Sequence, residues 1–532
     1  MVMDRRSTAV LVARFGLVLA LAAGPASSSA QEPDKAKEAA ASEAAKGQAA
    51  KVDEVKAKEP AETSSTTRHR VVIDGKPVPY AATASLSLLR KDDGTARATV
   101  FSIAYVREGV ADAKSRPVTF SFNGGPGSAA VWVNLGAFGP RRGVLDPEGL
   151  PAGPLPGRLV DNELSLLDAT DLVFIDPVGT GFSRPAPGQD AKQFYGFKND
   201  VESVAEFIRL WLSRNGRWAS PKFIAGESYG TTRAVGLARH LQEQHGAFLN
   251  GIVLISSVLQ WQTLFFGTGN DLPPLLFLPT YTATAWYHKK LPPELSGGLK
   301  GVVAEAERFA LEEYGPALLL GQRLKGPKRE EMAGKLARLT GLSREFVLRN
   351  DLRIGDERFR KELLRADGKL VGRLDSRYAG AEADPGAETG SSDPAGDVVD
   401  AYFVSLMNDH VRQELGFKTD LPYRHSAGLW KEWNYAESEN TAITPNYGDH
   451  LRAALVANPG LRVLVTSGYY DLATPHFATD FTLDHLDLPP GLRQNIEVAY
   501  YQAGHMMYVR KADHQKLRAD LLAFIQKATA SP

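Results

Sequence analysis

Apolar residues recur along the chain in two patterns, short runs and helical stripes. The runs predict buried strands. They lie at Val71–Ile73, Ala98–Val106, Val118–Phe122, Leu172–Ile175, Lys222–Ala225, Ile252–Ile255, Leu461–Val465 and Ile496–Tyr501. Helical spacing predicts amphipathic helices over Lys198–Leu212, Thr231–Gln244 and Leu517–Ala528. Strands that alternate with helices in this way favour an α/β fold with a doubly wound, mostly parallel sheet.

The alternation stops between about Gln260 and Asn440. Helical patterns continue there over Gly301–Leu320, Lys328–Leu339 and Asp356–Leu364, and Ser343 is suited to cap a short helix through Leu348. The composition of Ala379–Gly396 predicts a mobile loop. Strands needed by the sheet lie on both sides, so we expect residues 260–440 to be a mainly helical cap inserted between core segments 68–259 and 441–532. A separate domain is the alternative.

The N-terminal part has a different pattern. Basic residues precede a short apolar stretch at Phe15–Ala23, and small residues follow up to Ala30, which predicts a signal peptide over residues 1–30. An uncleaved anchor is the alternative, although the stretch is short for a bilayer span. Residues 31–67 are rich in Ala, Lys and Glu and predict a low-complexity linker. We therefore expect export, to the periplasm or beyond the cell, with no stable membrane association after cleavage.

Composition excludes some classes of function. The 532 residues include 62 basic and 62 acidic side chains, and no cysteine. Balanced charge gives no reason to expect a nucleic-acid partner. The absence of cysteine excludes a thiol nucleophile, disulfides and thiolate metal sites. We expect no metal or other cofactor, and the sequence does not determine an oligomeric state.

One predicted strand leads directly into a motif with chemical meaning. Gly226-Glu227-Ser228-Tyr229-Gly230 follows the run Lys222–Ala225, and a predicted helix comes next. Strand, tight turn and helix in this order favour a nucleophile elbow, in which the glycines permit the turn and the Ser228 hydroxyl is exposed. A strand-to-helix turn without chemistry is the alternative.

A serine hydroxyl becomes a nucleophile only when a base takes its proton. Among eleven histidines, His505 lies just beyond the last predicted strand, and Asp471 follows the strand before it. Carboxyl ends of parallel strands share one edge of a sheet, so Ser228, Asp471 and His505 form a candidate triad in the α/β-hydrolase order. His476, close to Asp471 in the sequence, is the main competing base.

An oxyanion hole needs two backbone N–H groups directed at the developing charge. Tyr229, after the nucleophile, supplies the first. The loop Asn123–Gly127 follows a predicted strand and contains three glycines, and Gly125 is the expected second donor because Pro126 has no N–H. A tight turn without chemistry is the alternative. A phosphate loop is disfavoured, since no Gly-Lys-Ser/Thr follows.

Together these motifs resemble the serine carboxypeptidases, peptidase family S10, in a bacterial-type form. The resemblance rests on Phe122–Gly127, Asp176–Ser183, Gly226–Gly230, Gly468–Asp471 and Gly504–Met506, in the family's order. It implies an α/β-hydrolase fold with a helical cap, and hydrolysis of C-terminal residues from peptides with a free C-terminus. It also implies that Asn123 and Glu227 bind the terminal carboxylate and that Gly125 and Tyr229 form the oxyanion hole.

Several positions depart from the family pattern. Ser128 stands where a cysteine is usual, Thr231-Thr232-Arg233 replaces a run of small residues, and Asn134–Phe138 lacks an expected acid. A serine esterase or acyltransferase on the same fold is therefore the alternative to a carboxypeptidase. A binding protein without activity is a third interpretation, which the complete set of Ser228, Asp471 and His505 disfavours.

Overall fold

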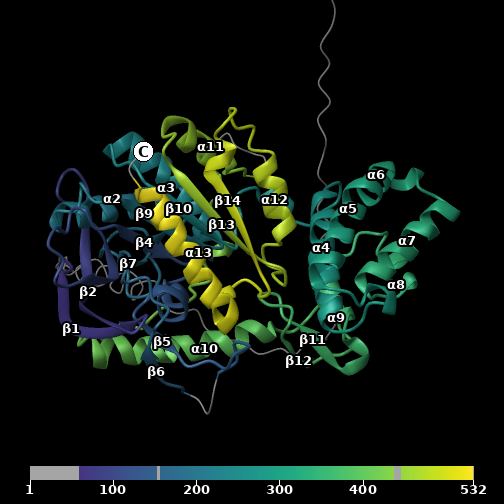
Figure 1. Ribbon diagram of the computed structural model, residues 1–532, viewed down its shortest axis with the longest axis horizontal. Coiled ribbons are helices and arrows are strands. Elements are labelled where there is room, and N and C mark those ends of the chain that lie inside the picture. Colours follow the sequence, from purple (N-terminus) through teal and green to yellow (C-terminus); the bar gives the residue numbers. More distant parts are fainter. Residues whose placement is uncertain (1–58, 152–155, 437–444, 531–532) are drawn as a thin grey trace, which may run out of the picture. The chain divides into compact units, whose positions relative to one another are not determined.

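The computed structural model of the protein describes residues 59–151, 156–436 and 445–530 (Figure 1). The predicted signal peptide and most of the predicted linker lie outside these residues. None of the described helices is long and apolar enough to cross a membrane.

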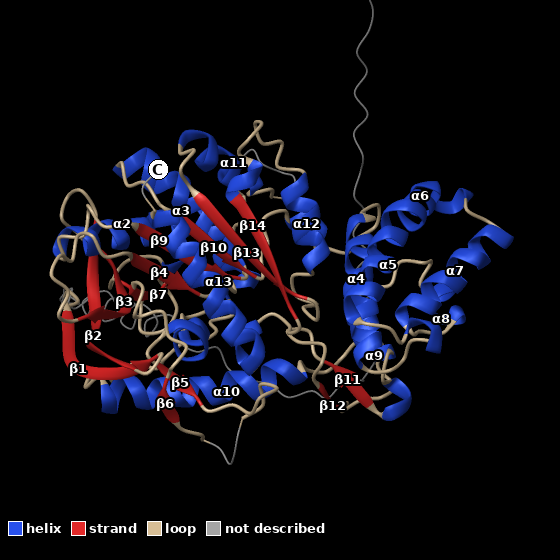
Figure 2. Cartoon of the chain, in the orientation of Figure 1, coloured by secondary structure: helices blue, strands red, loops and turns tan. Residues whose placement is uncertain are grey.

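A ten-stranded mixed sheet is the main element of the described residues (Figure 2). Its order is β1 (Thr63–Ile73), β2 (Lys76–Arg90), β3 (Ala96–Arg107), β7 (Asp171–Asp176), β4 (Val118–Phe122), β9 (Lys222–Glu227), β10 (Gly251–Ile255), β13 (Arg462–Gly468) and β14 (Ile496–Tyr501), with β8 (Arg184–Pro185) paired to β3. The strands from β7 to β14 are parallel to one another, and β1, β2 and β3 form an antiparallel edge. The predicted fold class, a mostly parallel α/β sheet, is confirmed.

Helices surround the sheet. Those nearest it are α2 (Phe197–Arg214), α3 (Tyr229–His245), α10 (Pro394–Asp409), α11 (Gly448–Ala457), α12 (His476–Asp484) and α13 (Lys511–Thr529). Single-turn 3₁₀ segments are η2 (Ala191–Phe194), η3 (Trp261–Thr263), η4 (Pro293–Leu295), η6 (Gly321–Arg323), η7 (Arg365–Asp367), η9 (Leu429–Lys431), η10 (Arg493–Asn495) and η11 (Met507–Val509). Three π turns are η1 (Val133–Phe138), η5 (Ala310–Tyr314) and η8 (His410–Glu414). Two small ribbons pair β5 (Arg141–Gly143) with β6 (Leu159–Asp161), and β11 (Lys369–Val371) with β12 (Ala379–Ala381).

The pleat of β9 shows why this strand is apolar on both faces. Phe223 and Ala225 enter a hydrophobic cluster with α10 and α13, whereas Ile224 enters a second cluster with α2, α3 and α11. Successive side chains point to opposite faces of a strand, so a strand between two helical layers needs a continuous apolar run. The layers hold the end of β9, and therefore the elbow, in a fixed position.

A third hydrophobic cluster belongs to the inserted helices. They are α4 (Leu272–Tyr287), α5 (Leu299–Phe309), α6 (Gly315–Leu320), α7 (Pro327–Thr340), α8 (Arg344–Arg349) and α9 (Asp356–Glu362). The helix predicted over Gly301–Leu320 is interrupted by η5, because Pro316 lacks the N–H that a continuous helix would use. Ser343 caps α8 as predicted, accepting a hydrogen bond from the Phe346 N–H at 3.1 Å. The missed helix α4 is apolar on nearly all sides and has no polar stripe to indicate its period.

The N-terminal edge of the sheet differs from the prediction. β1 begins at Thr63, so the fold starts earlier than residue 68 and the linker cannot extend to residue 67. Residues 63–67 are polar and largely exposed, and they are held by pairing with β2, in register Thr63 with Leu86, rather than by burial. Composition alone could not reveal this pairing. β2 itself was missed, and Asp92-Asp93-Gly94 joins β2 to β3.

The second half of the inserted region also differs from the prediction. The predicted mobile loop Ala379–Gly396 contains β12 at its start and the first turn of α10 at its end. α10 belongs to the core, because Val399, Tyr402 and Phe403 join the cluster beneath the sheet and not that of the inserted helices. The prediction that all of residues 260–440 form the cap is therefore wrong for α10.

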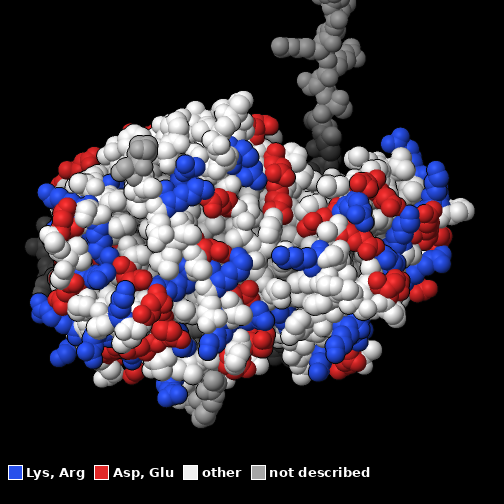
Figure 3. Space-filling view, in the orientation of Figure 1, with Lys and Arg blue, Asp and Glu red and all other residues white. Residues whose placement is uncertain are grey.

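Charged side chains of both signs are interspersed over the face in view in Figure 3. This pattern agrees with the formal net charge of zero. It presents no broad basic surface on that face for a polyanion.

Candidate active site

The parallel strands place the candidate residues at one edge of the sheet. Asn123 follows β4, Ser228 follows β9, Ser256 follows β10, Asp471 follows β13 and His505 follows β14. Parallel neighbours end at the same side, and each parallel pair from β4 through β14 is in register along this path. Residues far apart in the sequence are therefore brought to one place.

Ser228 has the backbone conformation of a nucleophile elbow. Its φ and ψ are 59° and −129°, a strained combination for a residue with a side chain. The glycines on either side permit the turn. A Cβ at Gly226 would overlap the Gly230 carbonyl, and one at Gly230 would lie 3.1 Å from the Phe122 carbonyl oxygen. The turn leaves Ser228 partly exposed, although Glu227 and Tyr229 beside it are buried.

His505 and Asp471 form a buried pair. The His505 Nδ1 lies 2.8 Å from the Asp471 Oδ2, and their side chains are 5% and 0% exposed. The other carboxylate oxygen accepts the N–H groups of Ala473 and Thr474 at 2.8 and 2.9 Å, so the carboxylate cannot turn away. Burial lowers the pKa of His505, but the charge and hydrogen bond of Asp471 outweigh it, and the pKa is raised overall.

The competing base, His476, faces elsewhere. Its Nε2 lies 3.1 Å from the Glu307 Oε1, and its Nδ1 lies 3.3 Å from the Thr280 hydroxyl. Both partners belong to inserted helices. Nearness to Asp471 in the sequence therefore did not bring the His476 imidazole to that carboxylate.

The end of β10 connects the serine and histidine loops. The Ser228 N–H donates to the Ile255 carbonyl at 2.9 Å, and the Ser256 hydroxyl donates to the His505 carbonyl at 2.7 Å. Ile255 and Ser256 are adjacent in the chain, so one peptide unit anchors both loops. Ser256 was missed by sequence reasoning, because a serine after a strand has no distinguishing pattern.

The loop after β4 packs directly on the elbow. A Cβ on Gly124 would overlap the Tyr229 nitrogen and lie 2.7 Å from the Gly230 nitrogen. Gly125 has φ of +101°, a region that favours glycine. Tyr229 is the first residue of α3, where a backbone N–H has no acceptor within the helix. The two N–H groups expected to bind an oxyanion therefore lie on backbone segments in direct contact.

Asn123 and Glu227 are brought together, with a third residue. The Asn123 Nδ2 donates to Glu227 Oε1 at 2.8 Å, and the Tyr508 hydroxyl donates to Glu227 Oε2 at 2.6 Å. The Asn123 Oδ1 accepts the Val133 N–H at 3.2 Å, which fixes the orientation of the amide. Tyr508 was not predicted as a site residue, although it lies three residues after His505 and two residues after the motif Gly504–Met506.

Burial raises the pKa of Glu227. The charge of His505 and the hydrogen bonds from Tyr508 and Asn123 oppose burial, but the net shift is upward. A carboxyl group with a raised pKa can be protonated and donate a hydrogen bond to an anion. Glu227 can therefore accept or donate according to pH.

Arg233, a departure from the family pattern, connects the elbow helix to the Asn123 loop. It is fully buried, its Nε donates to Asp200 Oδ2 at 2.8 Å, and its Nη1 donates to the Asn123 carbonyl at 2.8 Å. The same Asp200 oxygen accepts the Tyr229 hydroxyl at 3.2 Å. The buried guanidinium thus joins both segments of the expected oxyanion hole. The sequence Thr231-Thr232-Arg233 alone could not reveal these contacts.

Residues 101–263 match the family described as serine carboxypeptidase. This segment contains the elbow and the Asn123 loop, whereas Asp471 and His505 lie outside it. The match agrees with the resemblance seen in the motifs.

Two curated relatives match over a similar length. The chain is 34% identical over 125 residues to Serine carboxypeptidase-like 29 of Arabidopsis thaliana, covering 23% of this chain and 24% of that protein. It is 34% identical over 119 residues to Serine carboxypeptidase-like 11 of the same plant, covering 22% and 26%. The matched stretch spans about a quarter of these relatives.

The fold of a solved carboxypeptidase is similar over most of both chains. The structure of KEX1(delta)P, a prohormone-processing carboxypeptidase from Saccharomyces cerevisiae, aligns with a TM-score of 0.52 at 15% identity, covering 84% of this chain and 91% of that one. At 15% identity this comparison is evidence for the fold alone. It agrees with the α/β-hydrolase arrangement of the strands in the central sheet.

Proposed function

We propose that this protein is a serine-type carboxypeptidase that removes C-terminal residues from peptides through an acyl-enzyme on Ser228. The observation that carries the proposal is the buried group of Asn123, Glu227 and Tyr508 immediately beside the elbow. Glu227 precedes Ser228, and adjacent Cα atoms lie about 3.8 Å apart. A terminal carboxylate bound at Glu227 would therefore leave only the last peptide bond within reach of the Ser228 hydroxyl.

The proposed reaction follows from the residues at the sheet edge. His505, oriented by Asp471, takes the Ser228 proton while the hydroxyl oxygen attacks the last peptide carbonyl. The N–H groups of Gly125 and Tyr229 stabilise the tetrahedral oxyanion. The C–N bond breaks as His505 protonates the leaving amine, and a free amino acid departs. Water, deprotonated by His505, then attacks the acyl-enzyme and releases the shortened peptide.

Two pKa shifts give the proposal a pH dependence. Burial raises the pKa of Glu227, and its neutral form can donate to the substrate carboxylate, whereas its ionised form would repel it. Peptide binding should weaken as pH rises through the Glu227 pKa. His505 must be neutral to act as a base, so turnover should fall as pH drops through the His505 pKa.

The deciding experiment compares peptides that differ only in a free or amidated C-terminus. We expect KM for the free peptide to rise with pH and KM for the amidated one to be independent of it. Glu227→Gln retains a donor but cannot ionise, so it should flatten the difference. Identical profiles for both peptides in the wild type would exclude carboxylate recognition and favour the esterase or acyltransferase alternative.

A second experiment tests the nucleophile. Phosphonofluoridate should label Ser228 in the wild type, and Ser228→Ala should abolish labelling and turnover without unfolding the protein, because little volume is removed. Wild-type turnover by Ser228→Ala would exclude the mechanism. Retained labelling of another serine would point to a different active site.

We also propose a bacterial-type enzyme that is exported to the periplasm or secreted, acts on peptides with a free C-terminus, and is released from the membrane after processing. The support is the signal-peptide pattern in residues 1–30. N-terminal sequencing of the mature protein from cell fractions would test this. An N-terminus at Met1 in the cytoplasmic fraction would contradict it.

A further inference from the structure

A short segment of the inserted region connects the loops that carry Asp471 and His505. Residues 373–376 follow β11 and run between the two loops. The N–H groups of Leu472 and His505 donate to backbone carbonyls of this segment at 3.0 and 2.6 Å. The segment donates in return, from Ser376 N–H to the Tyr470 carbonyl at 2.9 Å. The aspartate and histidine loops therefore share one neighbour.

Within this segment, the Asp375 side chain accepts a hydrogen bond from the loop that carries His505. Its Oδ2 accepts the Gly504 N–H at 3.0 Å, and the residue is 5% exposed. Gly504 has no room for a side chain, because a Cβ there would lie 2.5 Å from Asp375 Cα and Cβ. Gly504 immediately precedes His505, so this carboxylate holds the backbone from which the imidazole extends.

Arg377 holds Asp375 in this position. Its Nε lies 3.0 Å from Oδ1 and its Nη2 lies 2.6 Å from Oδ2, and both side chains are buried. A two-point contact of this kind fixes orientation as well as charge. The Asp375 carboxylate cannot rotate without losing either Arg377 or the Gly504 N–H.

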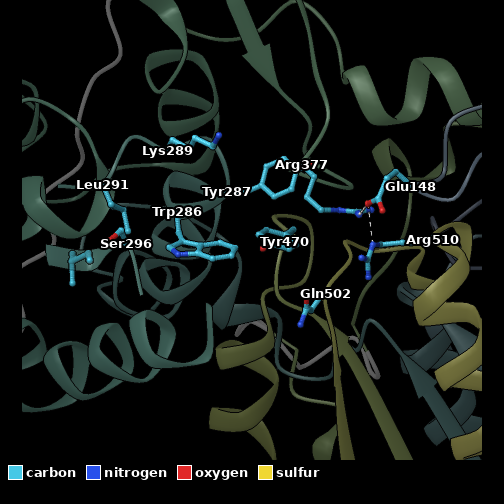
Figure 4. Close-up of a pocket in the computed structure, with 11 residues that line it drawn as sticks. Glu148, Trp286, Tyr287, Lys289, Leu291, Ser296, Arg377, Tyr470, Gln502 and Arg510 are labelled. Carbon is cyan, nitrogen blue, oxygen red and sulfur yellow. Dashed lines mark hydrogen bonds and ion pairs between the residues drawn. The ribbon is translucent and has the colours of Figure 1, made fainter. Parts of the chain in front are cut away.

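The other side of Arg377 borders a cavity of about 600 Å³ lined by Tyr287 and Tyr470 (Figure 4). Glu148 lies at the edge of this cavity and contacts Arg377 and Arg510 at 3.3 and 3.0 Å. The Glu148 side chain is 59% exposed, so solvent screens these outer contacts. The network thus consists of the buried pair Asp375–Arg377 beside the histidine loop and of Glu148 at the exposed edge. Glu148 can therefore serve as a control position.

We infer that Asp375, held by Arg377, is a positioning residue for the proposed hydrolysis, because it fixes the Gly504–His505 backbone and thereby aligns the imidazole. The inference rests on the proposed roles of Ser228 and His505. Asp375 acts through His505 and does not touch the reacting atoms. Loosening the loop by about 1 Å would cost on the order of 100-fold in rate.

The test compares Asp375→Ala, Asp375→Asn and Glu148→Gln in the full chain, with phosphonofluoridate labelling of Ser228 as the readout. Asp375→Ala should lower kcat and the labelling rate about 100-fold with little change in KM. Asp375→Asn retains an oxygen that can accept the Gly504 N–H but loses the two-point contact with Arg377, so it should recover only part of the rate. Glu148→Gln alters only the exposed part and should behave as wild type.

The pH profile separates positioning from a general loss of fold. The charged groups that face His505 are Asp471, Glu227 and Arg373. Against the lowering effect of burial, Asp471 raises the His505 pKa, so a loosened loop should weaken this effect and move the acid limb of labelling to lower pH. If Asp375→Ala does not fold, Arg377→Lys keeps the charge but loses the two-point contact, and should show the same change at smaller amplitude.

The outcomes distinguish a failure of the proposed function from a failure of the proposed positioning role of Asp375. Absence of labelling in the wild type would refute the proposed function itself. Wild-type labelling together with an unchanged rate and acid limb in folded Asp375→Ala, or in Arg377→Lys, would overturn the positioning role. A loss that follows only the folded fraction measured by circular dichroism would also overturn it.

Discussion

Replacing Arg233 by Met should strongly destabilise the protein at neutral pH. The Arg233 and Asp200 side chains are 1% and 3% exposed, and Arg233 Nε lies 2.8 Å from Asp200 Oδ2. Removing one partner of a buried pair leaves an uncompensated charge and costs about 3–5 kcal/mol. The guanidinium also lies 4.9 Å from the Phe122 ring centre, a contact that Met would only partly replace.

The loss should depend on pH, with a sign set by Asp200. Burial raises the pKa of Asp200, and Arg233 opposes that rise. Without Arg233 the folded carboxyl binds protons more readily than the unfolded one, whose pKa is about 3.9. The free energy of unfolding should therefore fall as pH rises from about 4, until the pH exceeds the folded pKa. At acidic pH the variant should approach wild type.

Urea unfolding followed by tryptophan fluorescence, across a series of pH values, measures this loss. Two controls separate the buried charge from other effects. Arg239 lies on the same helix in an exposed pair with Glu243, so Arg239→Met should cost only about 0.3–0.5 kcal/mol. Removing both charges in Asp200→Asn with Arg233→Met should restore much of the stability. A cost below about 1 kcal/mol for Arg233→Met, or one independent of pH, would refute the reasoning.

Two further predictions concern the site. Asp471→Asn should lower kcat on the order of 10⁴-fold, because the amide favours the wrong histidine tautomer. His476→Ala, which loses the contacts with Glu307 and Thr280 on the inserted helices, should retain the Ser228 labelling rate. Comparable losses in both variants would contradict the assignment of the base. Tyr508→Phe removes a hydrogen bond that opposes the burial-raised pKa of Glu227, so KM for a free peptide should stay low to a higher pH than in wild type. An unchanged KM profile would separate Tyr508 from carboxylate binding.

Local patterns in the sequence were sufficient for several elements. β4 and β14 occupy the residues predicted for them, and the Ser343 cap forms as expected. The conformation of Ser228 also follows from the residues around it, since position 226 has no room for a side chain and a Cβ at position 230 would make a tight contact with the Phe122 carbonyl. Each of these features depends on sterics or hydrogen bonds within a few residues, which a sequence displays directly.

Edge strands were less predictable. β1 is polar and exposed in its first half, and the pairing with β2 that stabilises it depends on a neighbouring strand rather than on its own composition. α10 likewise looked like part of a loop and cap region, although its apolar side packs under the central sheet. In both cases the missing information is the identity of the surface that each segment contacts.

The sequence by itself determined the elbow, the order of the candidate groups along the chain and the α/β class. Only the tertiary structure decided which histidine meets Asp471, and it added Tyr508, Arg233 and Asp375. Asn123 and Glu227 are 104 residues apart, and Tyr508 and Glu227 are 281 apart. Contacts at such separations arise from the alignment of parallel strand ends and from close packing, and no local pattern of side chains encodes them.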